Sequence, residues 1–291
     1  MGRDIYKNTE IGKSYLNKAD EIMDYDLSSI IFNGPENKLK ETRFTQPALF
    51  TVSVILGRLL VDRGSKPDFV AGHSLGEFSA LTIANSFDFE TGLKLVQCRA
   101  NAMYEAGKTL PGTMGAVIGL SPEKVQSICD DITKNGSVVS PANFNAPGQV
   151  VISGDINAVQ LCMSNAKECG AKMTVELNLS GAFHSALMKP ARHSLAEILN
   201  SIQIRDADFP IFLNVTAQPT TDKSEIKSNL LLQLEHPVLW SETIENMISY
   251  GTNRFLEIGP GKVLTGLNRR INKSALTQSI GTLNELNLCL A

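Results

Sequence analysis

Hydrophobic residues recur at helical spacing over most of the N-terminal part of the chain. This spacing predicts helices over residues 13–25, 45–62, 75–84 and 88–107. The second helix is apolar on most of its faces, which indicates that it is buried in a core. Thr45 is expected to cap its N-terminus, and Pro47 suits its first turn. One short strand-like run, residues 67–71, precedes the third helix.

From residue 112 the pattern changes to strands and helices of similar length. It predicts strands at residues 114–120, 137–143, 149–153 and 172–177, and helices at residues 122–133 and 156–169. The order strand, helix, strand, strand, helix, strand is that of a ferredoxin-like (βαββαβ) module. We therefore predict that residues 112–180 form a small domain inserted into a larger one.

Helices and strands alternate again after the predicted small domain. Helices are predicted at residues 184–202, 224–234, 241–250 and 263–271, and strands at residues 209–215 and 254–258. Beyond residue 272 the pattern is weak. Strands that alternate with helices favour a mostly parallel sheet covered on both faces. The predicted fold is thus an α/β large domain, formed by residues 1–111 and 181–291, that the small domain interrupts.

The composition is that of an ordinary soluble globular protein, and it mainly excludes some classes of function. The 291 residues are 43% hydrophobic and 20% charged, with a formal net charge of -3 and no run of lysine or arginine, which argues against a nucleic-acid surface. No apolar run reaches the roughly 18 residues of a membrane span, and the polar start has no signal-peptide core. We therefore expect a cytoplasmic protein with no membrane partner. The five cysteines form no Cys-x-x-Cys pair and predict neither a disulfide framework nor a metal site.

Residues 72–76, Gly-His-Ser-Leu-Gly, lie between the predicted strand at residues 67–71 and the helix that follows. They fit the G-x-S-x-G nucleophile elbow, in which a strained turn lifts a serine hydroxyl clear of the backbone. We expect glycine at both ends of the motif because a side chain at either position would crowd the turn. The alternative interpretation is a tight structural turn without chemistry.

A nucleophilic serine needs a base, and the chain has four histidines. His184 is the best candidate because it lies at a predicted strand-to-helix junction, where the sites of α/β proteins gather. His73 is a poor one, since neighbouring side chains of an extended strand point to opposite faces. His193 lies inside a predicted helix, and His236 lies in a polar turn before a proline. A hydrogen-bonded structural histidine remains the alternative for His184.

Two further features predict less chemistry. Glu77 lies just inside a predicted helix and is expected to complement the helix dipole rather than to act as an acid or base. Residues 259–262, Gly-Pro-Gly-Lys, follow a strand but lack the spacer and the Ser/Thr of a Walker motif, so no nucleotide site is predicted there.

Five motifs in register resemble those of malonyl-CoA:acyl-carrier-protein transacylase, the acyltransferase of fatty-acid and polyketide synthesis. They are Thr-Gln-Pro-Ala-Leu at residues 45–49, Gly-His-Ser-Leu-Gly-Glu-Phe-Ser-Ala-Leu at 72–81, Asn-Phe-Asn-Ala-Pro-Gly-Gln-Val-Val at 143–151, Gly-Ala-Phe-His-Ser at 181–185 and Glu-Ile-Gly-Pro-Gly-Lys-Val-Leu-Thr-Gly-Leu at 257–267. Two runs, residues 180–185 and 87–92, resemble the free-standing acyltransferases that serve polyketide synthases. The family has an α/β-hydrolase-like large domain interrupted by a ferredoxin-like small one, in agreement with the order of elements predicted above.

The resemblance implies the chemical roles of three side chains. Ser74 corresponds to the nucleophile that accepts malonyl as an ester, and His184 to its general base. Arg99 corresponds to the arginine that holds the free carboxylate of malonate. A guanidinium fork suits this task because it makes two parallel charge-assisted hydrogen bonds.

Three further residues are implied to support the reaction. The backbone carbonyl of Gln233 corresponds to the group that orients the histidine in place of a triad acid, and the backbone N–H of Leu75 to one half of an oxyanion hole. Phe183 resembles the bulky residue of malonyl-selective members, which crowds the space that an α-methyl group needs. Excluding one methyl group is typically worth ~1–3 kcal/mol.

The start of the chain departs from the family pattern. Family members open with a strand and a Gly-Gln-Gly-Ser-Gln loop that supplies the second oxyanion donor, whereas this sequence begins Met-Gly-Arg-Asp. The hypothesis is that the natural protein starts further upstream. In-frame codons for that loop would support it, and an upstream stop codon would contradict it.

The sequence therefore predicts an [acyl-carrier-protein] S-malonyltransferase. Malonyl passes from malonyl-CoA to Ser74 and then to the phosphopantetheine thiol of an acyl carrier protein, with no cofactor bound to the enzyme, which is expected to be a monomer. One alternative is an acyl hydrolase on the same scaffold. The other is a docking or scaffold protein with impaired catalysis, which the joint presence of Ser74, His184 and Arg99 argues against.

Overall fold

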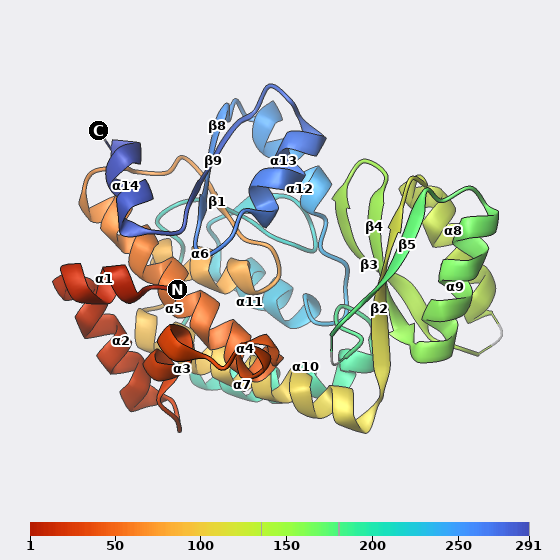
Figure 1. Ribbon diagram of the computed structural model, residues 1–291, viewed down its shortest axis with the longest axis horizontal. Helices are drawn as coiled ribbons and strands as arrows, with labels where there is room; N and C mark the ends of the chain where they lie inside the picture. Colours follow the sequence, from red (N-terminus) through yellow and green to blue (C-terminus); the bar gives the residue numbers. More distant parts are fainter. Residues whose placement is uncertain (135, 180, 291) are drawn as a thin grey trace.

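The chain folds into a larger and a smaller domain (Figure 1). The computed structural model describes residues 1–134, 136–179 and 181–290. The predicted end of the small domain at residue 180 and the last residue of the predicted large domain, 291, lie outside the described residues.

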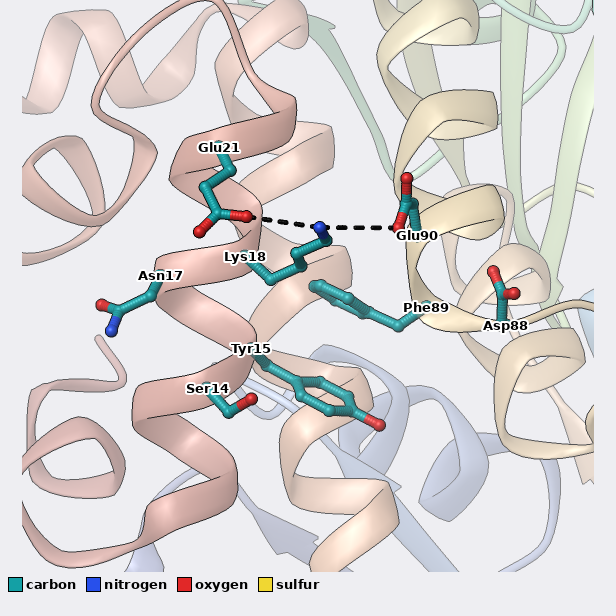
Figure 2. A pocket seen from close by; sticks show the side chains of 8 residues that line it. All are labelled: Ser14, Tyr15, Asn17, Lys18, Glu21, Asp88, Phe89 and Glu90. Carbon is teal, nitrogen blue, oxygen red and sulfur yellow. Dashed lines mark hydrogen bonds and ion pairs between the residues drawn. The ribbon is translucent and has the colours of Figure 1, made fainter.

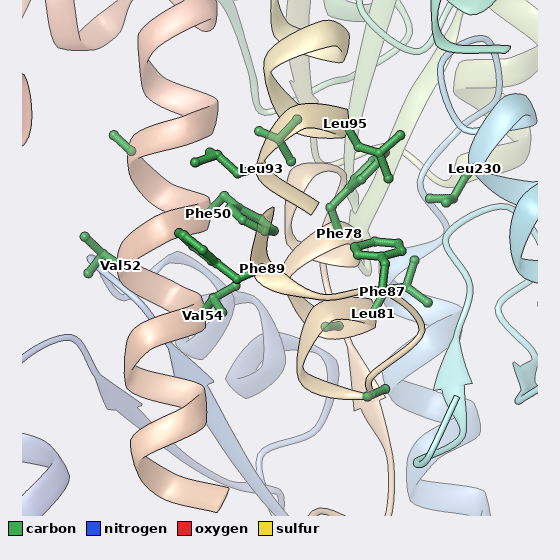
Figure 3. Close-up of a cluster of buried hydrophobic side chains, with 14 of the residues drawn as sticks. Phe50, Val52, Val54, Phe78, Leu81, Phe87, Phe89, Leu93, Leu95 and Leu230 are labelled. Carbon is green, nitrogen blue, oxygen red and sulfur yellow. The ribbon is translucent and has the colours of Figure 1, made fainter. Parts of the chain in front are cut away.

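Helix α5 (Thr42–Asp62) forms the centre of the large domain, packed against α6 (Leu75–Ile83) and α7 (Phe89–Thr109). Phe50 of α5 stacks on Phe89 of α7 with ring centroids 5.8 Å apart (Figure 3). Among the described residues, α5 is the one helix long and apolar enough to cross a membrane, yet 72% of its apolar window is buried inside the protein. It is a core helix, as its all-round hydrophobic pattern predicts.

The start of α5 differs from the expectation. The helix begins at Thr42, so Thr45 does not cap it, and Pro47 lies beyond the first turn. Proline has no N–H to donate to the carbonyl of Arg43, four residues earlier. The hydroxyl of Tyr25 donates to that carbonyl instead, at 3.2 Å. A side chain thus replaces the missing backbone bond, and the helix continues through the proline.

Four shorter helices precede α5 in the large domain (Figure 1). They are α1 (Arg3–Asn8), α2 (Glu10–Ile22), α3 (Leu27–Asn33) and α4 (Glu36–Lys40). Helix α2 corresponds to the helix predicted over residues 13–25. Its Tyr15 stacks on Phe89 with ring centroids 4.5 Å apart, which ties these helices to the central core.

The large domain contains two short sheets. In the first, β1 (Val70–Ala71) pairs in parallel with β6 (Ile211–Phe212), and β7 (Pro219–Thr220) pairs with β6 in the antiparallel sense. In the second, β8 (Arg254–Ile258) runs parallel to β9 (Leu276–Ile280). The mostly parallel character is confirmed, although the strand predicted over residues 209–215 is only two residues long.

The C-terminal tail, where the sequence pattern is weak, holds β9 and α14 (Leu283–Leu290). Strand β9 escapes prediction because only its last residue, Ile280, is fully buried, while Leu276 and Gln278 face solvent. A strand without a continuous apolar face carries no clear period-two signal.

The small domain has the predicted order of elements. It contains β2 (Gly112–Ile118), α8 (Pro122–Thr133), β3 (Val139–Ala146), β4 (Gln149–Asp155), α9 (Ile156–Glu168) and β5 (Met173–Leu177). Its four strands are antiparallel in the order β3-β4-β2-β5, with both helices packed on the sheet over a separate core (Figure 1). This is the ferredoxin-like arrangement that the sequence predicts.

The chain returns to the large domain through a single turn of 3-10 helix, Ala186–Met188, and four α-helices: α10 (Lys189–Ser201), α11 (Lys223–Leu232), α12 (Trp240–Ser249) and α13 (Val263–Ile271). The helix predicted from residue 184 therefore starts later, and His184 precedes it in a left-handed conformation with φ 58°. At the start of α13, both carboxylate oxygens of Glu257 accept backbone N–H groups, from Leu264 at 2.9 Å and Thr265 at 2.7 Å. The Glu257 carboxylate thus caps the N-terminus of the helix that follows the loop at residues 259–262.

The two domains meet beside the segment after α11. The Phe144 N–H of β3 donates to the Val238 carbonyl, and the Val238 N–H donates to the Ala142 carbonyl, both at 2.9 Å. Strand β3 of the small domain is therefore bonded to the large-domain segment that follows Gln233.

Candidate active site

Ser74 occupies the sharp turn between β1 and α6. Its φ of 52° and ψ of -105° lie in a region that residues with side chains rarely adopt. A Cβ added to Gly72 would lie 1.9 Å from the backbone carbon of Gly76, so only glycine fits at position 72. At Gly76 an added Cβ would meet no atom of another described segment within 4 Å. The expectation of crowding is therefore confirmed for Gly72 and wrong for Gly76.

Two side-chain amides hold the strained main chain of Ser74. Asn214, just after β6, accepts from the Ser74 N–H at 2.7 Å and donates to the Gly72 carbonyl at 2.6 Å. Gln233 donates through Nε2 to the Ser74 carbonyl at 3.0 Å. Strained conformations persist where the surroundings over-determine them, and these contacts do so here.

His184 is the histidine that meets the serine. Its Nε2 lies 2.8 Å from Ser74 Oγ, and its Nδ1 lies 2.7 Å from the Gln233 carbonyl and 3.2 Å from the His236 carbonyl. Carbonyl oxygens only accept, so Nδ1 carries the proton and Nε2 is free to accept the serine proton. Burial, and then the nearby Arg99 charge, lower the pKa of His184 to about 3, which keeps the imidazole neutral.

The other three histidines lie elsewhere. His73 pairs through Nε2 with Asn145 Oδ1 at 2.8 Å, and its ring lies against Trp240. His193 faces solvent on α10, and the Nδ1 of His236 lies 2.9 Å from the Leu232 carbonyl. The sequence-based preference for His184 therefore agrees with the geometry.

Arg99 of α7 is buried, with 1% of its surface exposed, beside the serine. Its guanidinium donates to Gln46 Oε1 at 2.5 Å, to Ser74 Oγ at 2.9 Å and to Gln233 Oε1 at 2.9 Å. Its Nε, also buried, has no partner among the described residues. Burial lowers the pKa of Arg99 to about 10, opposed by the charge of Glu77, so the side chain stays cationic at neutral pH.

Glu77 lies in the first turn of α6, where the dipole interpretation places it, but its side chain is not on the surface. It is fully buried, accepts from Gln233 Nε2, and accepts from the Asn214 N–H at 3.4 Å. Burial raises the pKa of Glu77 to about 7, against the lowering effect of these hydrogen bonds and of Arg99. Sequence reasoning missed both this role and Asn214, because neither residue carries a pattern that reveals its distant partners.

A cavity of about 220 Å³ opens beside these groups. Its walls are Lys40, Thr42, Thr45, Gln46, Leu49, His73, Ser74, Leu75, Arg99, Met103, Leu179 and Phe183. It is smaller than the roughly 300–1,000 Å³ typical of sites for drug-sized ligands, and its size suits a short acyl group.

A second, wider cavity of about 520 Å³ lies between α2 and the start of α7 (Figure 2). There the Lys18 ammonium lies 3.3 Å from the Glu21 carboxylate and 3.7 Å from that of Glu90. None of the predicted site residues lines it, and exposed pairs of this kind contribute about 0–1 kcal/mol each. It is a surface groove lined by one lysine and three carboxylates, Glu21, Asp88 and Glu90.

The family model described as acyl transferase domain matches residues 1–284. The chain belongs to the acyltransferase family. It is 41% identical to malonyl CoA-acyl carrier protein transacylase of Bacillus subtilis (strain 168) over 290 residues, which are 100% of this chain and 92% of the relative. The same kind of protein from Staphylococcus aureus (strain MW2) is 41% identical over 286 residues, 98% of this chain and 92% of the relative.

Solved structures show the same relationship for this acyltransferase. An acyl carrier protein S-malonyltransferase of Vibrio cholerae superposes with a TM-score of 0.95 at 40% identity, covering 99% of this chain and 94% of that one. A malonyl-transacylase in complex with its type II polyketide synthase acyl-carrier protein superposes with a TM-score of 0.94 at 38% identity, covering 100% of this chain and 94% of that one. The family resemblance and the α/β fold with a large and a small domain are confirmed.

In this acyltransferase the six residues singled out by the resemblance lie together. The cavity is lined by Ser74, Leu75, Arg99 and Phe183. His184 contacts the Ser74 hydroxyl, and the Gln233 carbonyl contacts His184 on its other ring nitrogen. The Leu75 N–H is the first of α6, where a helix leaves its amides without intrahelical acceptors.

Proposed function

We propose that the protein transfers malonyl from malonyl-CoA to the phosphopantetheine thiol of an acyl carrier protein, through a malonyl ester of Ser74. Relatives with this activity in their names cover the whole chain, and one solved neighbour is a complex with an acyl carrier protein. The domain limits that go with this proposal are residues 1–111 and 181–291 for the large domain and 112–180 for the small one.

The observation that carries the proposal is the pairing of a buried cation with the nucleophile. Arg99 donates to the Ser74 hydroxyl itself, and its acceptors among the described residues are neutral. A buried guanidinium without a direct carboxylate partner is costly unless a ligand supplies the anion. The free carboxylate of a malonyl group supplies it within reach of the serine.

In the first half-reaction His184 acts as general base. Its Nε2 takes the proton of Ser74 while Oγ attacks the thioester carbon, and the Leu75 N–H donates to the oxyanion. The C–S bond then breaks, and the CoA thiolate leaves with the proton held by His184. The products are malonyl-Ser74 and free CoA.

The second half-reaction is the reverse with a new thiol. His184 takes the proton of the phosphopantetheine thiol, the sulfur attacks the ester, and Ser74 recovers its proton. The Gln233 carbonyl keeps the imidazole in the productive tautomer throughout. Phe183, buried at the cavity wall, restricts space beside the acyl chain and favours malonyl over a methyl-branched homologue.

The setting of this reaction is also part of the proposal. We place the protein in the cytoplasm as a monomer, with no cofactor of its own. The carrier protein docks by an acidic face near the mouth between the two domains, and Lys40 is a cation among the residues that line the cavity.

The test is the intact mass of the purified protein after incubation with malonyl-CoA. A malonyl-sized increment is expected on the wild type and on Ser201→Ala, an exposed serine on α10, and none on Ser74→Ala. Added holo-acyl carrier protein should discharge the increment and gain it.

The same experiment separates the alternatives. An increment that decays in buffer as fast as in the presence of carrier protein indicates a hydrolase. A folded wild type that never gains the increment refutes the proposal and favours the docking protein.

A further inference from the structure

The proposed reaction assigns no role to one buried acid, Glu77. Glu77 lies in the first turn of α6, with none of its surface exposed. Its Oε2 accepts from Gln233 Nε2, and its Oε1 accepts from the Asn214 N–H at 3.4 Å. Burying a carboxylate is expensive, so a fully buried one far from solvent calls for a physical reason.

The hydrogen-bonding capacities around Gln233 provide one. An ionised carboxylate can only accept, and a guanidinium can only donate. The amide of Gln233 lies between the two, with Nε2 toward Glu77 and the Ser74 carbonyl, the latter at 3.0 Å, and Oε1 toward Arg99 at 2.9 Å. If the amide turned over, its NH2 group would face the donors of Arg99 and its oxygen would face the acceptor of Glu77. Glu77, together with the Ser74 carbonyl, therefore keeps the oxygen end of the amide toward the arginine.

An indirect connection also leaves the arginine available. A carboxylate bonded directly to the guanidinium would compete with the carboxylate of the acyl group for the same donors. In the described part of the chain, Arg99 is instead held by two neutral amide oxygens, of Gln46 and Gln233, with Nε unpartnered. The negative charge of Glu77 is separated from the guanidinium by the Gln233 amide. There it offsets the charge of Arg99 without using the hydrogen-bond donors of the guanidinium.

Resting on the function proposed above, we propose that Glu77 is a positioning residue that sets selectivity for carboxylated acyl groups. It holds the Gln233 amide in the orientation that keeps Arg99 directed at the acyl carboxylate. Glu77 touches neither the substrate nor the reacting atoms.

The variant Glu77→Gln tests this because it keeps the shape of the side chain. Both carboxylate oxygens face N–H donors, and an amide has only one acceptor end. The new NH2 group must therefore face either Gln233 Nε2 or the Asn214 N–H. When it faces Nε2, the Ser74 carbonyl is the one acceptor among the described residues that still holds the NH2 group of Gln233 in place. A matched control is Glu257→Gln, which also replaces a carboxylate whose two oxygens each accept an N–H group, here both from the backbone at the start of α13.

The measurement is the rate of Ser74 acylation by malonyl-CoA and by acetyl-CoA, read by intact mass. Acetyl has no carboxylate for Arg99 to hold, so its rate depends on Arg99 only through the contact with Ser74 Oγ. Glu77→Gln is expected to lower the malonyl-to-acetyl ratio by about tenfold, the effect of one charge-assisted hydrogen bond, and Glu257→Gln to leave it unchanged. In an Arg99→Ala background the same substitution should leave the ratio unchanged, because Arg99, through which Glu77 acts on the acyl carboxylate, is absent.

A merely structural Glu77 gives another pattern. Equal loss for both substrates, no loss for either, or a further fall in the ratio in the Arg99→Ala background overturns the proposal. The function itself is judged separately, by whether the wild type is malonylated at Ser74 at all.

If Glu77→Gln does not fold, the pH dependence of the malonyl-to-acetyl ratio in the wild type tests the proposal instead. Burial raises the pKa of Glu77 to about 7, so protonation below pH 7 turns one of its oxygens into a donor. Arg99 on α7 is the charged group that faces it, while burial lowers the pKa values of His73 and His184 and keeps both neutral. The malonyl-to-acetyl ratio should fall from pH 8 to pH 6, and a constant ratio overturns the proposal.

Discussion

Replacing Arg99 is the most direct way to test how the site recognises its substrate. In the structure the guanidinium is buried, keeps its charge, and donates to Ser74 Oγ at 2.9 Å, so an acyl group on that oxygen lies beside it. A malonyl carboxylate that accepts two charge-assisted hydrogen bonds gains about 1.5–3 kcal/mol from each. Arg99→Ala should therefore raise the barrier for malonyl transfer by about 3–6 kcal/mol, or roughly 10²–10⁴ in kcat/KM.

Arg99→Lys should recover part of this loss. A lysine keeps the positive charge but is a point donor without the fork, so it offers one strong contact where arginine offers two. We expect it to lie between the wild type and Arg99→Ala, about one hydrogen bond from each.

The assay is acylation of Ser74 by malonyl-CoA and acetyl-CoA under single-turnover conditions. Acetyl transfer should change far less than malonyl transfer in both variants, since acetyl has no group for the arginine to hold. Thermal unfolding of each variant controls for loss of fold. If Arg99→Ala slows both substrates equally while the fold is intact, Arg99 serves the nucleophile and the reasoning about the carboxylate is refuted.

Three other predictions concern the fold and its pH dependence. Gly72→Ala should lower the unfolding temperature strongly, through a clash costing at least about 1–3 kcal/mol, whereas Gly76→Ala should leave it nearly unchanged; equal effects in thermal scans would contradict the elbow geometry. Tyr25→Phe should cost about 1 kcal/mol in urea unfolding, and much less in a Pro47→Ala background, where a backbone N–H again reaches the Arg43 carbonyl; additive costs would contradict the substitution of one donor for the other. The unfolded chain protonates His184 at its ordinary pKa of 6.5, whereas burial and Arg99 lower the folded pKa to about 3, so the stability that His184 contributes should fall by about 2 kcal/mol from pH 7 to pH 5. Glu77, whose folded pKa is raised to about 7, changes stability in the opposite direction over this range, so the comparison is between the wild type and His184→Asn, which share Glu77. Urea unfolding of both proteins at pH 7 and pH 5 measures it, and an equal change in the free energy of unfolding for the two would refute it.

Local chemistry in the sequence determined much of this protein. The elbow needs glycine at position 72 because any Cβ there meets the next turn of backbone, and that requirement is visible as a motif. The βαββαβ order of the small domain follows from alternating apolar faces within short segments, so periodicity alone predicts it. Where local signals were misleading, tertiary contacts prevailed. The proline at position 47 suggests a helix start, but a hydroxyl from another segment allows the helix to pass through it.

Only the tertiary structure decided how the site is supported. The Ser74 main chain is held by Asn214 and Gln233, which lie 140 and 159 residues away along the chain. Glu77 appears in sequence as an ordinary acid at a helix start, yet in the fold it is fully buried against Gln233. Such roles depend on which donors and acceptors the packing of α6, α7 and the segment after α11 brings within about 3 Å. A hydrogen bond between distant segments leaves no periodic trace in the sequence, and therefore it becomes visible only once the chain is folded.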